Sequence, residues 1–265
     1  MSQSCGKAIG FMAWLVNSRK QEILERIESC LEVDTPTAKG IQKRMYLNLG
    51  VTVAEFLRMP HMKDQEVRDL ISYQNAELVP EDRKFIALVA HTGNWEILAA
   101  TTPFFGYGNM NVVVKSLKPE KFNEWLCKVR SRWGTKYHDR HGSSRSLLRV
   151  LKTKEPLGFV LDQNTKVNMG IFVNFFGKPA CTSDGLAQLA AISGYTILPV
   201  FCRRDTQTLK LIVEVGEAIR GPEDRSESEI LRVTQECTDK LETFIRKYPD
   251  QWIWMHRRWR TQKPE

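Results

Sequence analysis

Apolar residues in the first third of the chain recur at helical spacing. Between Ser18 and Val33 they come every three or four positions, and charged residues occupy the opposite face. The pair Thr35-Pro36 supplies an N-cap and a first-turn proline for a second helix that runs towards Leu57. Residues 63–73 predict a third helix. The pattern therefore predicts a helical N-terminal part over residues 1–80.

From residue 81 onward, strand and helix signals alternate. Phe85 to Ala90 is an apolar run of six residues, too short for a helix and typical of a buried strand. Further strands are expected at 111–115, 157–161, 171–176, 196–202 and 209–215, and helices at 95–100, 119–133, 143–154, 182–193 and 223–247. This alternation predicts an α/β fold with a mostly parallel mixed sheet covered by helices. We expect one domain over residues 1–265, with the α/β core at 81–265.

A histidine and a carboxylate follow the first predicted strand. Residues 91–96 read His-Thr-Gly-Asn-Trp-Glu, in which Asn94 is expected to cap a helix that has Glu96 in its first turn. The intervening turn allows Glu96 to fold back and hold one ring nitrogen of His91, while the other nitrogen takes a proton from a substrate hydroxyl. The same spacing also suits a partly buried histidine beside a capping glutamate.

Three other segments carry candidate chemistry. Asp162-Gln163 follows the predicted strand 157–161, and Asp162 suits a hydroxyl, an arginine or a metal, or simply starts a turn. Arg130, near a predicted helix end, suits either a phosphate clamp or the helix dipole. The aromatic strand 171–176 belongs to the core or walls an acyl tunnel.

Charge limits the partners without choosing among them. Lys and Arg outnumber Asp and Glu by 39 to 31, and the resulting charge of +8 suits nucleic acid, anionic lipid headgroups or an acidic carrier protein equally well. The tail 252–259 mixes tryptophan with arginine. Such a mixture suits a membrane interface, lipid phosphates, nucleic-acid stacking or a seal on the domain.

Cysteine usage and the N-terminal apolar run narrow the setting. The six cysteines form no C-x-x-C pair, which excludes a zinc cluster of that kind and favours a reducing cytoplasmic compartment. No convincing metal-ligand spacing is present. Residues 8–16 are apolar but far short of the roughly 20 needed to span a bilayer. They predict either a membrane-dipping anchor or a first helix packed on the domain.

Six short motifs occur along the chain, at residues 91–96, 130–134, 161–163, 175–177, 198–200 and 251–259. Together and in this order they resemble the bacterial lipid A biosynthesis lauroyl/myristoyl acyltransferase family. The chain is also similar to the wider glycerolipid acyltransferase group, whose motif is a histidine, four residues and an acidic residue.

The resemblance implies transfer of a fatty acyl chain from acyl carrier protein or acyl-CoA to a hydroxyl of a lipid A precursor or related phosphorylated glycolipid, without a cofactor or metal. It implies His91 as general base and Glu96 as the carboxylate that orients it. The substrate-binding residues that it implies are Asn94, Arg130, Asp162, Gln163, Arg257 and Arg258.

The resemblance also implies work at the cytoplasmic face of the inner membrane. Family members commonly begin with a hydrophobic membrane helix, whereas here only residues 8–16 are apolar. We therefore expect peripheral attachment to an anionic membrane surface through basic and tryptophan-rich surfaces. A lysophospholipid or another membrane lipid is the alternative acceptor. A basic nucleic-acid-binding protein is the alternative outside enzymes, but no recognition motif supports nucleic acid as a partner.

Overall fold

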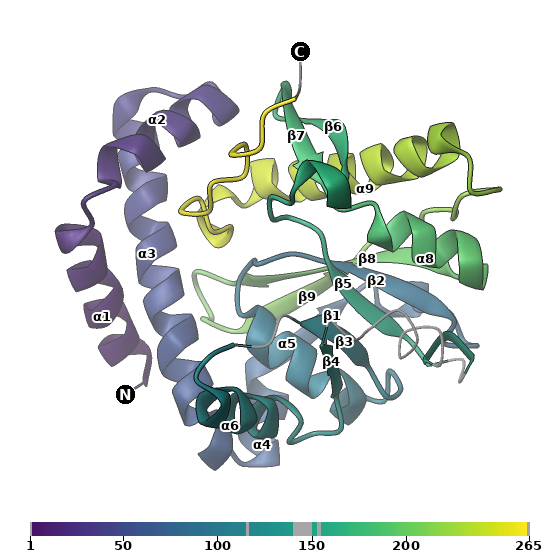
Figure 1. Cartoon of the computed structure of the whole chain (residues 1–265). Helices are drawn as coiled ribbons and strands as arrows, with labels where there is room; N and C mark the ends of the chain where they lie inside the picture. Colours follow the sequence, from purple (N-terminus) through teal and green to yellow (C-terminus); the bar gives the residue numbers. More distant parts are fainter. Residues whose placement is uncertain (1, 115–116, 140–149, 153–154, 264–265) are drawn as a thin grey trace.

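Three helices come first and stand beside a helix-covered sheet (Figure 1). The computed structural model describes residues 2–114, 117–139, 150–152 and 155–263. The first helices are α1 (Ser2–Val16), α2 (Lys20–Leu31) and α3 (Thr35–Arg58). Asp34, rather than Thr35, caps α3, because its side chain accepts a hydrogen bond from the backbone N–H of Thr37. The two long predicted helices are confirmed.

Glycines bring α1 and α3 into backbone contact. A Cβ on Gly10 would lie 2.1 Å from the carbonyl oxygen of Tyr46, and one on Gly50 would lie 2.2 Å from the carbonyl oxygen of Gly6. The interpretation of the first apolar segment as a packed helix is therefore confirmed. Its outer face nevertheless leaves Met12 exposed. No helix within the described residues combines the length and the apolar character that a bilayer span requires.

Within the described ranges, the sheet has seven strands in the order β1-β9-β8-β2-β5-β3-β4. All neighbouring pairs are parallel except β8 with β9, so the predicted mostly parallel mixed sheet is confirmed. The strands are β1 (Ile71–Gln74), β2 (Phe85–Val89), β3 (Asn111–Val114), β4 (Lys136–Asp139), β5 (Leu157–Val160), β8 (Thr196–Arg204) and β9 (Leu211–Val215), with a separate hairpin of β6 (Ile171–Phe175) and β7 (Lys178–Thr182).

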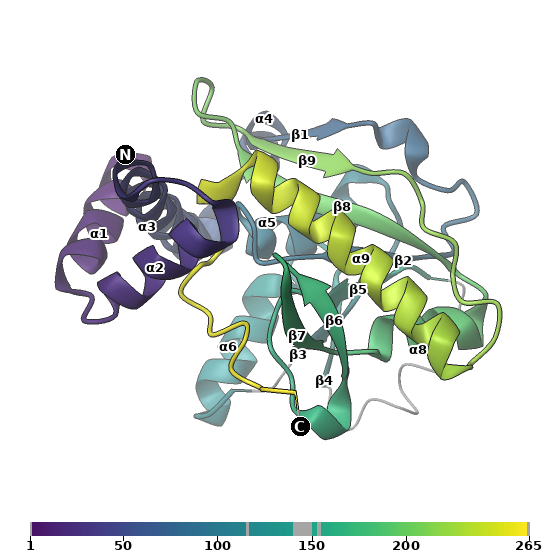
Figure 2. The ribbon, with the colours of Figure 1, turned by 90° about the horizontal axis from the view of Figure 1, so that it is seen from above.

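Helices cover both faces of this sheet, as Figure 2 shows for α9 lying across β8 and β2. Ile86 and Leu88 of β2 belong to the core cluster under α8 and α9, whereas Phe85 and Ala87 belong to a cluster on the opposite face, with Ala99 of α5. The unbroken apolar run of β2 follows from burial on both faces. The other helices whose bounds are described are α4 (Asp64–Leu70), α5 (Trp95–Thr101), α6 (Glu120–Arg130), α8 (Gly185–Ser193) and α9 (Glu227–Lys247), with short 3₁₀ turns at 59–61, 76–78, 102–105, 167–169 and 249–251.

The structure corrects the sequence prediction at three places. The third helix ends at Leu70, because residues 71–74 instead form β1 and pair with β9, so the part over 1–80 is not purely helical. Strands β4 and β7 were not predicted. The helix expected at 143–154 lies almost entirely outside the described residues.

Candidate active site

Strand register places His91 beside Asp162. Strands β2 and β5 pair in parallel with Val89 opposite Val160, and each chain continues for two more residues to reach His91 and Asp162 respectively. Neighbouring strands lie about 4.8 Å apart, so two side chains at matched positions are within hydrogen-bonding reach. The Nδ1 atom of His91 lies 2.8 Å from Oδ1 of Asp162.

A tryptophan from the C-terminal tail completes this arrangement. The indole Nε1 of Trp252 donates to Oδ2 of Asp162 over 2.8 Å, and both side chains are buried. Trp252, Asp162 and His91 therefore form a series of hydrogen-bonded side chains, called the ladder below, with the carboxylate in the middle. Since Nδ1 of His91 faces a buried carboxylate, it is assigned as the N–H donor, and Nε2 is left as the basic nitrogen.

His91 and Asp162 each favour the charged form of the other. Burial works to lower the pKa of the His91 imidazole, but the charge and hydrogen bond of Asp162 outweigh it, so that pKa lies above its ordinary value. Burial works to raise the pKa of Asp162, and the hydrogen bonds from His91 and Trp252 together with the charge of His91 bring it below its ordinary value. A lone buried carboxylate would have the opposite shift.

Glu96 does not hold the ring of His91, and the predicted contact is wrong. Its carboxylate instead forms a bidentate pair with the guanidinium of Arg130, with distances of 2.7 Å to Nε and 2.5 Å to Nη2. Fork-shaped arginine and carboxylate groups match in geometry, and both side chains are largely buried. Through space the charge of Glu96 raises the pKa of His91, and the charge of Arg130 lowers it. The positive charge of Arg130 is thereby balanced by Glu96, which weakens the case for Arg130 as a phosphate clamp.

Asn94 is used within the protein rather than towards a ligand. Its Oδ1 accepts from the backbone N–H of Ile97 over 3.1 Å, which confirms the predicted helix cap. Its Nδ2 donates to Glu55, and the residue is fully buried, so both polar atoms of its side chain are used within the protein. Gln163 fits the expectation better, because it is exposed and its amide nitrogen lies 3.3 Å from Nε2 of His91.

A large cavity of about 700 Å³ reaches the histidine. His91, Glu96, Arg130 and Gln163 contribute polar groups to its wall. Most other lining residues are apolar and come from the sheet face opposite α9, from α5 and from neighbouring segments, and they include Phe85, Ala87, Val89, Leu98, Ala99, Met110, Val112, Val114, Leu198, Val200 and Val215. Apart from the paired Arg130, no Lys or Arg occurs among the described residues that line it.

The tryptophan and arginine tail lies mainly inside the protein. Trp252, Trp254 and Arg258 are fully buried, so the interpretation of the tail as a seal on the domain is confirmed, and these residues present no surface to a membrane or a nucleic acid. Arg258 donates to the backbone carbonyl of Cys181 at 2.8 Å, and burial lowers its pKa to about 10. Arg257 is half exposed and faces Glu22 of α2. Neither arginine lines the cavity.

The aromatic strand belongs to the core. Phe175 and Phe176 are buried and pack against tryptophans of the tail, with a centroid distance of 5.7 Å between Phe175 and Trp259. None of residues 171–176 lines the cavity that reaches His91. The role of Trp252 was missed, since a tryptophan in a mixed tail carries no signal of the carboxylate that it meets.

Comparison with known proteins shows the family to which this chain belongs. The model for bacterial lipid A biosynthesis acyltransferases matches residues 1–261. The chain belongs to that family. A family member from Haemophilus influenzae, a lipid A biosynthesis acyltransferase, is 23% identical over 88% of this chain and 64% of its own length. The chain is also 24% identical to the phosphatidylinositol mannoside acyltransferase of Mycolicibacterium smegmatis, over 76% of this chain and 65% of that protein.

Two further similarities complete the comparison. The lipid A biosynthesis myristoyltransferase of Escherichia coli is 20% identical over 96% of this chain and 79% of its own length. Among solved structures, the 1-acyl-sn-glycerophosphate acyltransferase PlsC from Thermotoga maritima has a TM-score of 0.43 at 14% identity, covering 92% of this chain and 97% of that one. The chain described here spans just under two thirds of the length of the Haemophilus influenzae and Mycolicibacterium smegmatis relatives.

Proposed function

We propose that this chain transfers a fatty acyl group from a thioester to a hydroxyl of a membrane glycolipid. The observation that carries the proposal is the ladder of Trp252, Asp162 and His91 at a large apolar cavity. A buried carboxylate that fixes a histidine leaves the second ring nitrogen as a general base. Family membership supports the same reaction class.

In the proposed reaction, Nε2 of His91 takes the proton of the acceptor hydroxyl as the oxygen attacks the thioester carbonyl carbon. A new C–O bond forms, the C–S bond breaks, and the departing thiolate receives the proton from the imidazolium. Asp162 stabilises the charged ring throughout. Gln163 supplies an amide N–H beside the reacting centre, where it can bind the carbonyl oxygen as negative charge develops.

The cavity is proposed to hold the acyl chain. Its wall is mainly aliphatic, and β2 with the two residues that follow it runs beside the cavity from Phe85 to His91. The six extended steps between these two residues cover about 20 Å, which accommodates an extended chain of roughly a dozen to sixteen carbons. Among the described lining residues, the ion pair of Glu96 and Arg130 has no net charge. We therefore place phosphate groups of the acceptor outside the cavity, near its opening.

The donor and the acceptor are proposed at a coarser level. The positive net charge suits an acidic acyl carrier protein and also the phosphates of acyl-CoA. Relatives are named both for lipid A and for phosphatidylinositol mannoside, which supports a phosphorylated glycolipid as acceptor. A lysophospholipid is the second candidate, and only turnover of defined lipids separates the two.

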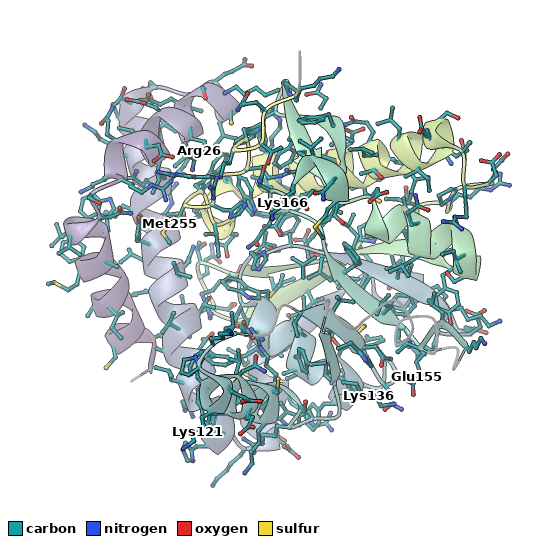
Figure 3. The ribbon with its side chains drawn as sticks, viewed as in Figure 1. Arg26, Lys121, Lys136, Glu155, Lys166 and Met255 are labelled. Atoms are coloured by element: carbon teal, nitrogen blue, oxygen red, sulfur yellow. The ribbon has the colours of Figure 1, made fainter. Side chains whose placement is uncertain are left out.

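Peripheral membrane attachment is proposed through α1, α3 and α6 rather than through the buried tail. Phe56 of α3 and Trp125 of α6 contact each other with a centroid distance of 5.9 Å, which joins the two helices at the surface. Lys121 lies on the outer side of α6 (Figure 3). Exposed apolar side chains with nearby cations suit the headgroup region of an anionic bilayer. The exposed apolar residues of these helices are Ile9, Phe11, Met12, Leu15, Val16, Val53, Leu57, Phe122 and Trp125.

The proposal is tested by incubating the purified protein with acylated carrier protein or acyl-CoA and a panel of lipid acceptors. The panel contains a lipid A precursor, a phosphatidylinositol mannoside and a lysophospholipid, and products are identified by mass spectrometry. Turnover of one acceptor by wild type and its loss in His91→Ala is the expected result. Equal turnover by a folded His91→Ala protein would refute the mechanism, and release of free fatty acid without any acceptor would indicate a thioesterase.

A further inference from the structure

A buried ion pair lies directly behind the turn that carries His91. Glu55 of α3 accepts a hydrogen bond from Nη2 of Arg204 on β8 over 2.5 Å, and both side chains are almost completely buried. The same carboxylate oxygen accepts from Nδ2 of Asn94 over 2.7 Å. Asn94 is thus held at both ends, by Glu55 and by the first turn of α5.

The turn is held at further points. Thr52, one helical turn before Glu55, donates from its hydroxyl to the carbonyl oxygen of Gly93 over 2.9 Å. The N–H of Gly93 donates to the carbonyl of Gln251, whose side chain in turn accepts from the N–H of Arg204. Gly93 has φ +54°, and a Cβ there would lie 2.6 Å from the carbonyl oxygen of Cys202. The backbone beside His91 is therefore clamped between α3, β8 and the C-terminal tail.

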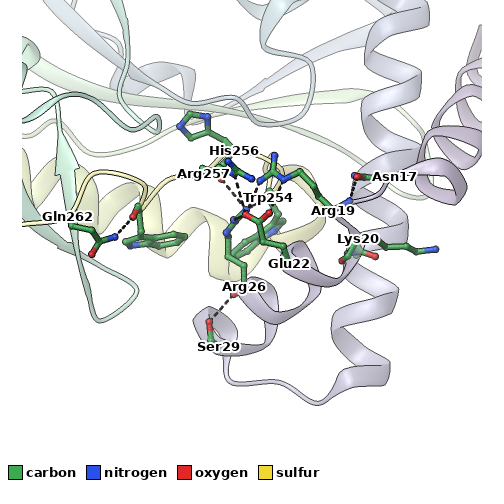
Figure 4. A network of polar contacts seen from close by, with 12 residues as sticks. Asn17, Arg19, Lys20, Glu22, Arg26, Ser29, Trp254, His256, Arg257 and Gln262 are labelled. Atoms are coloured by element: carbon green, nitrogen blue, oxygen red, sulfur yellow. Dashed lines mark hydrogen bonds and ion pairs between the residues drawn. The ribbon is translucent and has the colours of Figure 1, made fainter.

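The helical part also supports the other half of the ladder. Arg26 of α2 donates to the carbonyl oxygens of Trp254 and His256, and it also donates to the carboxylate of Glu22 (Figure 4). This tail segment carries Trp252, which binds Asp162. Helix α3 thus contacts the turn beside His91, and α2 contacts the tail segment that carries Trp252.

We propose that Glu55 is a positioning residue that sets the ring of His91 against Asp162 by holding Asn94 and the turn. Glu55 touches no substrate in this proposal and acts through Asn94 alone. For its activity readout the inference rests on the proposed acyl transfer, whereas its effect on the His91 ring does not.

The test removes the pair without leaving a buried charge alone. The double variant Glu55→Met/Arg204→Met replaces both charged side chains by flexible apolar ones, so that Asn94 loses its acceptor while volume is largely kept. The matched control is Arg203→Met/Glu214→Met, which removes the neighbouring ion pair between β8 and β9, with its 2.5 Å contact. Neither control residue contacts Asn94 through its side chain in the described structure.

Two measurements are made on each protein. One is the ¹⁵N and ¹H signal of the His91 ring, identified by its loss in His91→Ala and followed across pH. The other is kcat and KM for acyl transfer. We expect the Glu55 double variant to shift the ring signal and its titration, and to lose about tenfold to a hundredfold in kcat with little change in KM. The control is expected to keep the wild-type ring signal and a kcat within about twofold.

A folded Glu55 double variant with the wild-type ring signal and kcat would overturn the inference. If that variant does not fold, Asn94→Ser decides, because serine keeps an N-cap oxygen for the N–H of Ile97 and removes the amide that donates to Glu55. An unchanged His91 signal in Asn94→Ser would then overturn the inference, and a shifted signal would support it. If wild type transfers no acyl group, the proposed function fails, whereas the ring signal still tests the positioning role.

Discussion

Replacement of Asp162 by Asn tests the central ladder with almost no change in shape. The amide keeps an oxygen for the indole of Trp252, so its NH₂ group faces Nδ1 of His91. Nδ1 must then accept a hydrogen bond, and the ring proton moves to Nε2, where a base is required. The ring would thus be held in the wrong tautomer.

The expected loss is large because two contributions disappear together. The ring is then in the wrong tautomer, and the charge that stabilises the imidazolium is lost. We expect the two effects together to reduce kcat by about 10³ to 10⁴, which corresponds to roughly 4–5.5 kcal/mol of transition-state stabilisation. The fold should survive, because Asn has nearly the same volume as Asp. Thermal unfolding followed by circular dichroism checks this point.

The assay is steady-state acyl transfer with wild type, Asp162→Asn, His91→Ala and the double variant Asp162→Asn/His91→Ala. Residues that act as a unit are not additive, so the double variant should be no slower than His91→Ala alone. Glu96→Gln should lose only about tenfold, because the carboxylate acts on the ring through space. A folded Asp162→Asn protein within about threefold of wild type, or a strictly additive double variant, would refute the ladder.

Other changes probe the remaining inferences. Because a general base must be neutral and the pKa of His91 is raised, kcat/KM should rise with pH through a midpoint above 6.5; a pH profile flat between 5.5 and 8 would contradict this. Ala87→Phe should narrow the cavity and shift donor preference to shorter chains by about fourfold per methylene lost, measured as kcat/KM for donors of different length; an unchanged preference would argue against the acyl site. Trp125→Ser should weaken sedimentation with anionic vesicles by about fivefold to tenfold, whereas Leu231→Ser, which changes an exposed residue of α9, should not; equal effects would remove α6 from the membrane face. Gly10→Leu should destabilise the protein by about 1–3 kcal/mol in urea unfolding, because its side chain meets the backbone of α3, and unchanged stability would contradict that close contact.

The local elements and the family were accessible from the residues alone. Apolar spacing was enough to predict α2, α3 and β2, since periods of helix and strand depend on backbone geometry. Asn94 was predicted as a cap because capping is decided within four residues. Residues 71–73 of β1 were predicted as helix, because the partner strand β9 lies about 140 residues away in the chain.

The pairing of charges was decided only by tertiary structure. The sequence shows that His91 and Glu96 are close along the chain, and proximity along the chain suggested a dyad. The parallel register of β2 and β5 brings Asp162 to His91 instead, and the end of α6 brings Arg130 to Glu96. Register depends on the whole set of sheet contacts and not on any local pattern. The sequence alone was enough to predict most of the helices and strands, the family and the histidine at a strand end, whereas long-range packing determined β1 and which carboxylate that histidine meets.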